Sequence, residues 1–196
     1  MSVVLVTGPT AGIGKSLAYK FAERGYDLFL VARRLDRLKE IALDIEKKFN
    51  VNVEVLQSDL KNKNSPKEIY DYSRKTKLDV EILVLNAGYQ HNKTLHEVSL
   101  DDEEDCLRVL GLSVIMQTKL YLKDFIKRGG GKVLVVSSVA GFAPASPRYA
   151  VLYGPVKTFM NRFVEAINAA YNRENINATA LCLSLIHISE PTRHLL

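Results

Sequence analysis

Cysteine is scarce in this chain of 196 residues, and long apolar runs are missing from it. The two cysteines, Cys106 and Cys182, stand far apart, so their spacing predicts neither a disulfide framework nor a metal site. No apolar run approaches the ~20 residues that a membrane-spanning helix needs. A strand-like run begins at Val3, where a signal peptide would have a basic start. We therefore expect a cytoplasmic protein that does not contact membranes.

The lysines are not gathered in one stretch either. The formal net charge is +5, but basic and acidic residues are mixed on helix-like segments such as 40–50, EIALDIEKKFN. This pattern favours a solvated surface over a nucleic-acid-binding patch. The length, with 47% apolar and 25% charged residues, is typical of one globular domain with a sizeable core.

Short apolar runs alternate with helix-like segments along the chain. Such continuous apolar strands, separated by helices, predict a doubly wound, mostly parallel α/β sheet that is covered on both faces. Strands are expected at 3–7, 27–32, 51–56, 81–88, 132–138 and 176–183, and helices at 13–24, 35–49, from 65 onward, 100–128 and 149–173.

The first strand runs into a glycine-rich turn, TGPTAGIGK, and then into a helix. Gly8, Gly12 and Gly14 stand where side chains would keep a pyrophosphate away from the backbone, and the helix start supplies free N–H groups. The alternative is a turn that needs glycine only for tight geometry. The strand–glycine–helix context favours a dinucleotide site, and we include Thr10 and Ile13 in it.

Two arginines, Arg33 and Arg34, follow the second strand. Folds that prefer NAD usually have an acidic residue here for the ribose 2′-hydroxyl, whereas a guanidinium suits a 2′-phosphate. Although two ordinary surface arginines are the alternative, the pair favours NADP(H) over NAD(H).

The reactive groups follow the fifth strand. Ser138 ends that strand, and Tyr153 and Lys157 are four residues apart, so they share one helix face. A free tyrosine has a pKa of about 10, and a nearby ammonium stabilises the phenolate, which suits the phenol to proton transfer near neutral pH.

These motifs together resemble the short-chain dehydrogenase/reductase family over Ser2–Cys182, with further matches at Asp59 in SDL and at NAG, residues 86–88. The resemblance implies an oxidoreductase that transfers a hydride between nicotinamide and a small-molecule carbonyl or secondary alcohol. It implies that Tyr153 is the acid/base, that Lys157 tunes Tyr153 and holds the nicotinamide ribose, and that Ser138 binds the substrate oxygen. The implied cofactor-binding residues also include Asp59 and Leu60 at the adenine, and Asn86, Ala87 and Gly88 at the cofactor floor.

Two departures from the family pattern lie near these groups. Leu110 stands eight residues before Thr118, where the family commonly has an asparagine that supports a water relay. The leucine motivates a second hypothesis: a cofactor-binding but catalytically impaired sensor or scaffold. The Ser138–Tyr153 separation is also slightly long, but Tyr149, which would shorten it, lacks a lysine four residues on.

The C-terminal segment is the third departure. Residues 183–193, LSLIHISEPTR, are identical to a translated transposase-based sequencing adapter. We therefore expect a dinucleotide-binding domain at 1–182 and an artefactual tail at 183–196, with the family's last strand and substrate lid missing. In the family, the two long helices also form an oligomer interface, so we expect a homo-oligomeric parent protein.

Overall fold

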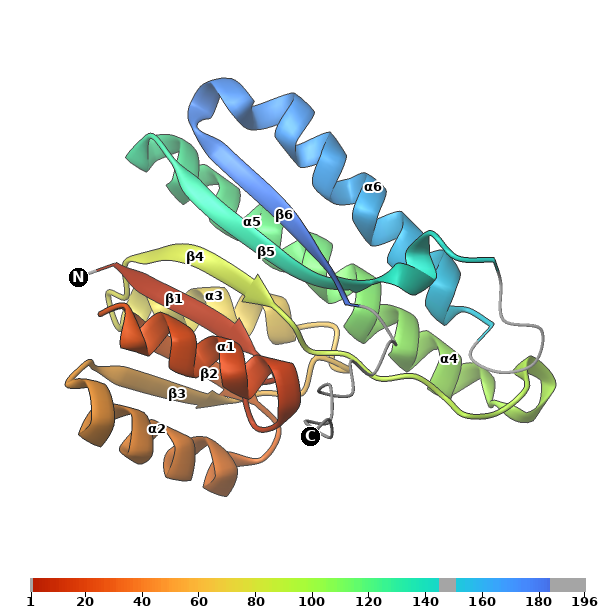
Figure 1. The fold of residues 1–196 in the computed structure, drawn as a ribbon, viewed down its shortest axis with the longest axis horizontal. Coiled ribbons are helices and arrows are strands. Elements are labelled where there is room, and N and C mark those ends of the chain that lie inside the picture. Colours follow the sequence, from red (N-terminus) through yellow and green to blue (C-terminus); the bar gives the residue numbers. More distant parts are fainter. Residues whose placement is uncertain (1, 145–150, 184–196) are drawn as a thin grey trace, which may run out of the picture.

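The computed structural model describes residues 2–144 and 151–183. Within them, six parallel strands form one sheet in the order β3-β2-β1-β4-β5-β6. This order confirms the predicted doubly wound sheet (Figure 1). The strands are β1 (Val3–Thr7), β2 (Asp27–Ala32), β3 (Val53–Gln57), β4 (Val80–Leu85), β5 (Gly131–Ser138) and β6 (Ile176–Leu183).

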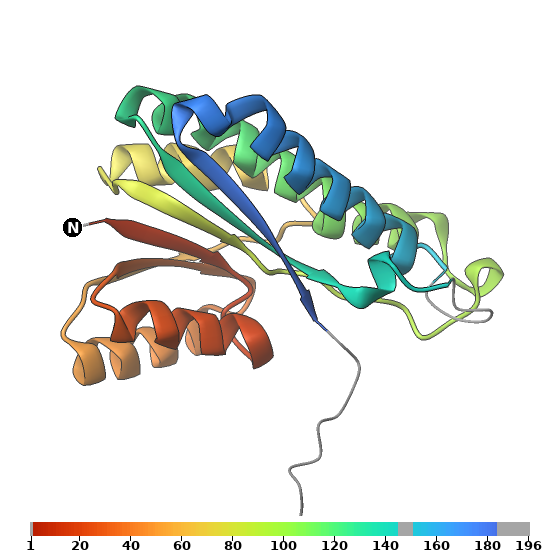
Figure 2. The ribbon, with the colours of Figure 1, turned by 45° about the horizontal axis from the view of Figure 1, so that its top comes forward.

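Helices cover both faces of the sheet, α1 and α2 on one side and α3, α5 and α6 on the other (Figure 2). Alternate residues of β1 enter the two cores: Val4 and Val6 face α1 and α2, while Val3 and Leu5 belong to the opposite core. Two-sided burial explains why the strand reads as a continuous apolar run. The helices are α1 (Gly12–Glu23), α2 (Leu35–Phe49), α3 (Ser65–Lys75), α4 (Leu100–Leu107), α5 (Ser113–Arg128) and α6 (Tyr153–Tyr171).

The segment predicted as one helix, 100–128, differs from that prediction. A π-helical turn, Arg108–Leu112, separates α4 from α5, and the N–H of Ser113 donates to the carbonyl of Arg108, five residues back. Such turns often lie at functional sites. Here the turn contains Leu110.

Helix α6 begins at Tyr153 rather than at the predicted Tyr149. Proline is tolerated in the first turn, where its missing N–H has no helical partner to lose. A start at Tyr153 places Pro155 in that turn, whereas a start at Tyr149 would place it in the helix interior. Tyr149 itself lies outside the described residues, as do residues 184–196 of the predicted tail.

The parallel strands bring the carboxyl ends of β1, β4 and β5 to one edge of the sheet. Sheet order reverses between β1 and β4, and ligands of open α/β sheets bind at such a switch point. At the other end of the order, β6 is an edge strand of the described sheet. None of the described helices is both long enough and apolar enough to span a membrane.

Candidate functional site

A cavity of about 570 Å³ lies at the carboxyl ends of the strands. It is lined by all but one of the residues that the sequence nominated, namely Gly8, Thr10, Ile13, Gly14, Arg33, Arg34, Asp59, Leu60, Asn86, Ala87, Gly88, Ser138, Tyr153 and Lys157. The fold thus brings segments from most of the chain's length to one site.

Gly14 permits a close approach between the first turn of α1 and the end of β4. A Cβ at Gly14 would lie 2.3 Å from Asn86 Nδ2 and 2.3 Å from the Gly8 carbonyl oxygen. Gly8 needs to be glycine for two reasons. Its φ is +69°, and a Cβ there would lie 3.0 Å from Asn86 Nδ2. Since a side chain would clash at either position, both must be glycine for the turn to pack against Asn86.

Gly12 is the nominated residue that does not line the cavity. Its φ is +53°, and a Cβ there would meet nothing within 4 Å. The left-handed backbone is by itself a reason for glycine at this position.

Asn86 joins the glycine turn to the end of β4. Its Nδ2 donates to the carbonyl oxygens of Thr7 (3.0 Å) and Gly8 (3.1 Å), and its backbone N–H donates to Thr7 Oγ1 (3.0 Å). Thr7 is 1% exposed, and its hydroxyl also accepts from the N–H of Ala87. Thr7 was not nominated from the sequence, although its place at the end of β1 is a signal that could have identified it.

The two arginines lie at the cavity beside the glycine turn. Arg34 Nη2 donates to Thr10 Oγ1 at 2.9 Å, which places this guanidinium next to the turn. Gln57 Nε2 donates to the carbonyl of Arg33 at 2.8 Å and ties the arginine segment to β3. Both guanidiniums belong to exposed residues, so a ligand entering from solvent can reach them.

Lys157 is a buried cation that lines the cavity together with Ser138 and Tyr153. It is 6% exposed, and its Nζ donates to the carbonyl of Val136 at 2.8 Å. Burial lowers the pKa of Lys157 from 10.5 to about 8, so the side chain is mainly an ammonium at neutral pH. Its Nζ lies 5.4 Å from the centre of the Tyr153 ring.

Ser138 is the last residue of β5, and its side chain caps the short turn that follows. Its Oγ accepts from the N–H of Ala140 at 3.1 Å, which leaves the hydroxyl proton able to donate elsewhere. The short turn Val139–Gly141 then packs on α6, where a Cβ at Gly141 would lie 2.9 Å from the Lys157 carbonyl carbon. This packing fixes the strand end that carries Ser138 against the helix that carries Lys157.

Leu110 is 2% exposed and forms a small apolar cluster with Cys106 and Val156. Tyr89 and Tyr153 pack against this cluster. The residue at the family asparagine position therefore contributes apolar surface beside Tyr153 and also lines the cavity.

A buried polar pair behind Lys157 was also absent from the sequence predictions. Ser137 Oγ donates to Asn161 Oδ1 at 2.6 Å, and Asn161 lies one helical turn after Lys157. Both side chains are buried, at 2% and 4% exposure. The spacing of Asn161 from Lys157 is one that many helices share, and Ser137 lies on a different element, so the sequence offered no specific signal for the pair.

The sheet order and the glycine turn at the switch point define a dinucleotide-binding type of α/β fold. The family model for short chain dehydrogenases matches residues 2–194. The chain belongs to the short-chain dehydrogenase family of oxidoreductases.

Individual relatives agree with this family. The very-long-chain 3-oxoacyl-CoA reductase of Rattus norvegicus is 30% identical over 178 residues, covering 88% of this chain and 55% of the relative. The chain thus spans about half the length of the curated relatives it matches. A short-chain dehydrogenase from Sphingobium yanoikuyae in complex with NADPH has a TM-score of 0.86 at 28% identity, covering 92% of this chain and 69% of that one. An alcohol dehydrogenase from Thermococcus sibiricus complexed with 5-hydroxy-NADP has a TM-score of 0.84 at 28% identity, covering 94% and 76%.

Proposed function

We propose that the protein carrying this chain is an NADP(H)-dependent carbonyl reductase or alcohol dehydrogenase with Tyr153 as its acid/base. The observation that carries the proposal is that one cavity is lined by the Arg33–Arg34 pair and by Ser138, Tyr153 and Lys157. A cofactor with a phosphorylated ribose and a reactive nicotinamide needs both groups in the same site.

The residues present fit such a cofactor. Gly8 and Gly14 line the cavity, and α1 begins at Gly12, directly after Ala11, whose methyl side chain cannot cap the free N–H groups that a pyrophosphate would accept from. Arg33 and Arg34 would hold the 2′-phosphate through charge-assisted hydrogen bonds. The NADPH and 5-hydroxy-NADP complexes of two structural relatives support this preference.

The cofactor, when bound, supplies or accepts a hydride at its nicotinamide ring. In the reducing direction, Tyr153 donates the phenolic proton to the carbonyl oxygen of the substrate, which becomes the alcohol. In the oxidising direction, the tyrosine takes the proton back. The Lys157 ammonium stabilises the phenolate left on Tyr153, and the Ser138 hydroxyl donates a hydrogen bond to the substrate oxygen.

For the substrate, we propose a small-molecule ketone or its alcohol. The 3-oxoacyl-CoA reductase relatives support testing 3-oxoacyl thioesters within this class. A cytoplasmic location and the absence of a nucleic-acid partner stay predictions from the sequence.

We further propose a homo-oligomer through α5 and α6. Large apolar side chains are exposed on these helices, at Met116 of α5 (46%) and Phe159 of α6 (51%). Leu112, directly before α5, is 48% exposed. Apolar side chains of this size favour burial against another chain. Sedimentation of the protein tests this, and a monomer at all concentrations would contradict it.

The second candidate is a cofactor-binding sensor or scaffold with impaired turnover. Its support is Leu110, which supplies a buried apolar side chain where the family has an amide. The two candidates share the binding of NADPH and differ in turnover.

Replacement of Tyr153 by phenylalanine separates them. The protein, at the length of its relatives, is assayed with NADPH on ketones that include a 3-oxoacyl thioester. We expect measurable turnover that falls by about 100-fold or more in Tyr153→Phe, while NADPH binding is kept. Tyr171→Phe, at the far end of the same helix, is the matched control. Turnover that survives in Tyr153→Phe would remove the acid/base assignment, and binding without turnover in the unmodified protein would favour the sensor.

A further inference from the structure

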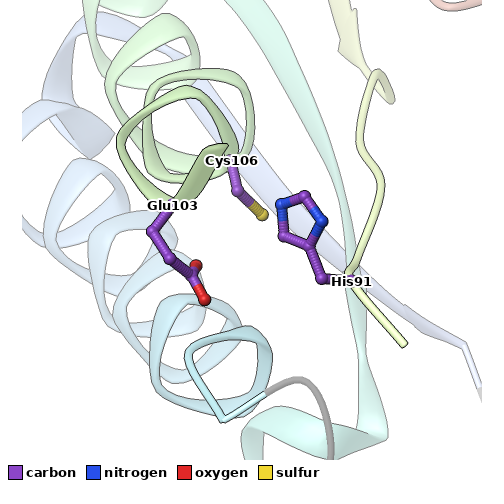
Figure 3. Close-up of side chains that lie close together, drawn as sticks. All are labelled: His91, Glu103 and Cys106. Carbon is purple, nitrogen blue, oxygen red and sulfur yellow. The ribbon is translucent and has the colours of Figure 1, made fainter. Parts of the chain in front are cut away.

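Three potential metal ligands of different chemistry meet beside the cavity. They are His91, Glu103 and Cys106, whose ligand atoms all lie within 4.8 Å of one another. Glu103 and Cys106 are three residues apart on α4 and share one face of that helix, while His91 belongs to the segment after β4. Figure 3 shows the three side chains pointing toward a common space.

We propose that His91, Glu103 and Cys106 form a zinc-binding site. Thiolate and imidazole ligands favour Zn²⁺ over Mg²⁺ or Ca²⁺, which prefer oxygen ligands alone. A carboxylate completes three protein ligands and leaves a fourth, tetrahedral position for water. Donor atoms in such a site stand about 3.5 Å apart, given metal–ligand bonds of about 2.0–2.3 Å. The three side chains therefore need to close by only about an ångström.

The surroundings of the three residues suit a bound cation. Cys106 is 5% exposed, so a metal bound to its sulfur is shielded on that side, whereas His91 and Glu103 are half-buried and leave an entry path. Within residues 2–144 and 151–183, the Glu103 carboxylate makes no hydrogen bond or ion pair. His91 Nε2 lies 3.2 Å from the Asp102 carbonyl oxygen, and the ring meets Tyr89 edge-on, so the imidazole is already held against α4.

An ion at this site would join α4 to the segment that forms the cavity floor. Cys106 Sγ contacts the Tyr89 carbonyl oxygen at 3.6 Å, and Tyr89 lines the cavity. The same cysteine packs in the cluster of Leu110 and Tyr153. The zinc site is therefore distinct from the cofactor cavity but shares a wall with it.

Competition between the full chain and a chromophoric zinc chelator tests the proposal directly, without an activity assay. We expect one Zn²⁺ per chain, with affinity reduced about 10-fold or more in each of His91→Gln, Glu103→Gln and Cys106→Ser. With Co²⁺ as a probe, a thiolate-to-metal charge-transfer band should appear and should be lost in Cys106→Ser.

The chain offers matched controls for the histidine and glutamate ligands. His96→Gln and Glu104→Gln change exposed neighbours, and His187→Gln with His194→Gln removes the histidines of the tail. All three controls should leave zinc affinity unchanged. Since His91 is half-buried on a connecting segment, His91→Gln is expected to fold, and circular dichroism checks this. Zinc affinity unchanged in folded His91→Gln, or reduced as much by a control, would overturn the site.

Discussion

Replacement of Gly14 by alanine should destabilise the fold and disrupt the cofactor turn together. The new methyl would stand 2.3 Å from both Asn86 Nδ2 and the Gly8 carbonyl oxygen, and one of these is backbone. Overpacking of this kind costs about 1–3 kcal/mol. Displacing the Asn86 amide also weakens its two hydrogen bonds to Thr7 and Gly8, at about 1 kcal/mol each. Alanine also reduces the conformational entropy of the unfolded chain, which offsets about 0.4–1 kcal/mol of this cost. We therefore expect the free energy of unfolding to fall by about 2–4 kcal/mol.

Urea unfolding followed by circular dichroism measures this loss, and a fluorescence titration with NADPH measures the effect on binding. Gly12→Ala is the matched control, because a Cβ at Gly12 meets nothing within 4 Å and only the φ of +53° opposes alanine. That strain costs about 1 kcal/mol. A Gly14→Ala protein as stable as Gly12→Ala would refute the close approach between α1 and β4.

Two further predictions concern charge. Burial lowers the pKa of Lys157 to about 8. Burial of the ammonium therefore lowers the free energy of unfolding by about 3 kcal/mol below pH 8. Lys157→Met removes this cost but also loses the hydrogen bond to the Val136 carbonyl. The variant should therefore be about 2 kcal/mol more stable than the wild type at pH 7. From pH 8 to 10.5 the unfolded chain keeps a proton that the folded chain has lost, so the wild type gains stability and the advantage should vanish in urea unfolding at pH 10. Arg34→Gln should weaken NADPH binding by about 10-fold or more, with little effect on NADH; equal losses for both cofactors in fluorescence titrations would contradict the 2′-phosphate assignment.

The sheet and most of the cavity could be predicted because their signals are local. Each strand is a short apolar run, and parallel strands necessarily bring their carboxyl ends to one edge. Ser138, at the end of its predicted strand, could therefore be assigned to this edge from its position, whereas Asn86 was assigned through the family resemblance. Gly14 could be predicted from the glycine-rich turn, although its contact with Asn86, 72 residues further along the chain, could not.

The π-helical turn was missed because nothing in its local pattern distinguishes it from an α-helix. Residues 100–128 have the apolar spacing and caps of one long helix, and the extra residue in the turn depends on what the helix packs against. The meeting of His91 with Glu103 and Cys106 was missed for a related reason. Ligands spread over two elements follow no motif spacing, so only the fold brings them together.

Leu110 shows how such tertiary contacts change the meaning of a departure from a family pattern. From the sequence, leucine at this position is a lost amide. In the structure, a Cβ at Gly88 would lie 2.7 Å from Leu110 Cδ2, so the leucine packs directly on the glycine of the NAG turn and lines the cavity there. An asparagine placed at Leu110 would remove that apolar contact and bury an amide among Cys106, Val156 and Tyr153. A buried amide is stable only with hydrogen-bond partners. Leu110 is therefore part of the packing that holds the NAG turn against the helix of Tyr153, and we expect Leu110→Asn to be destabilising.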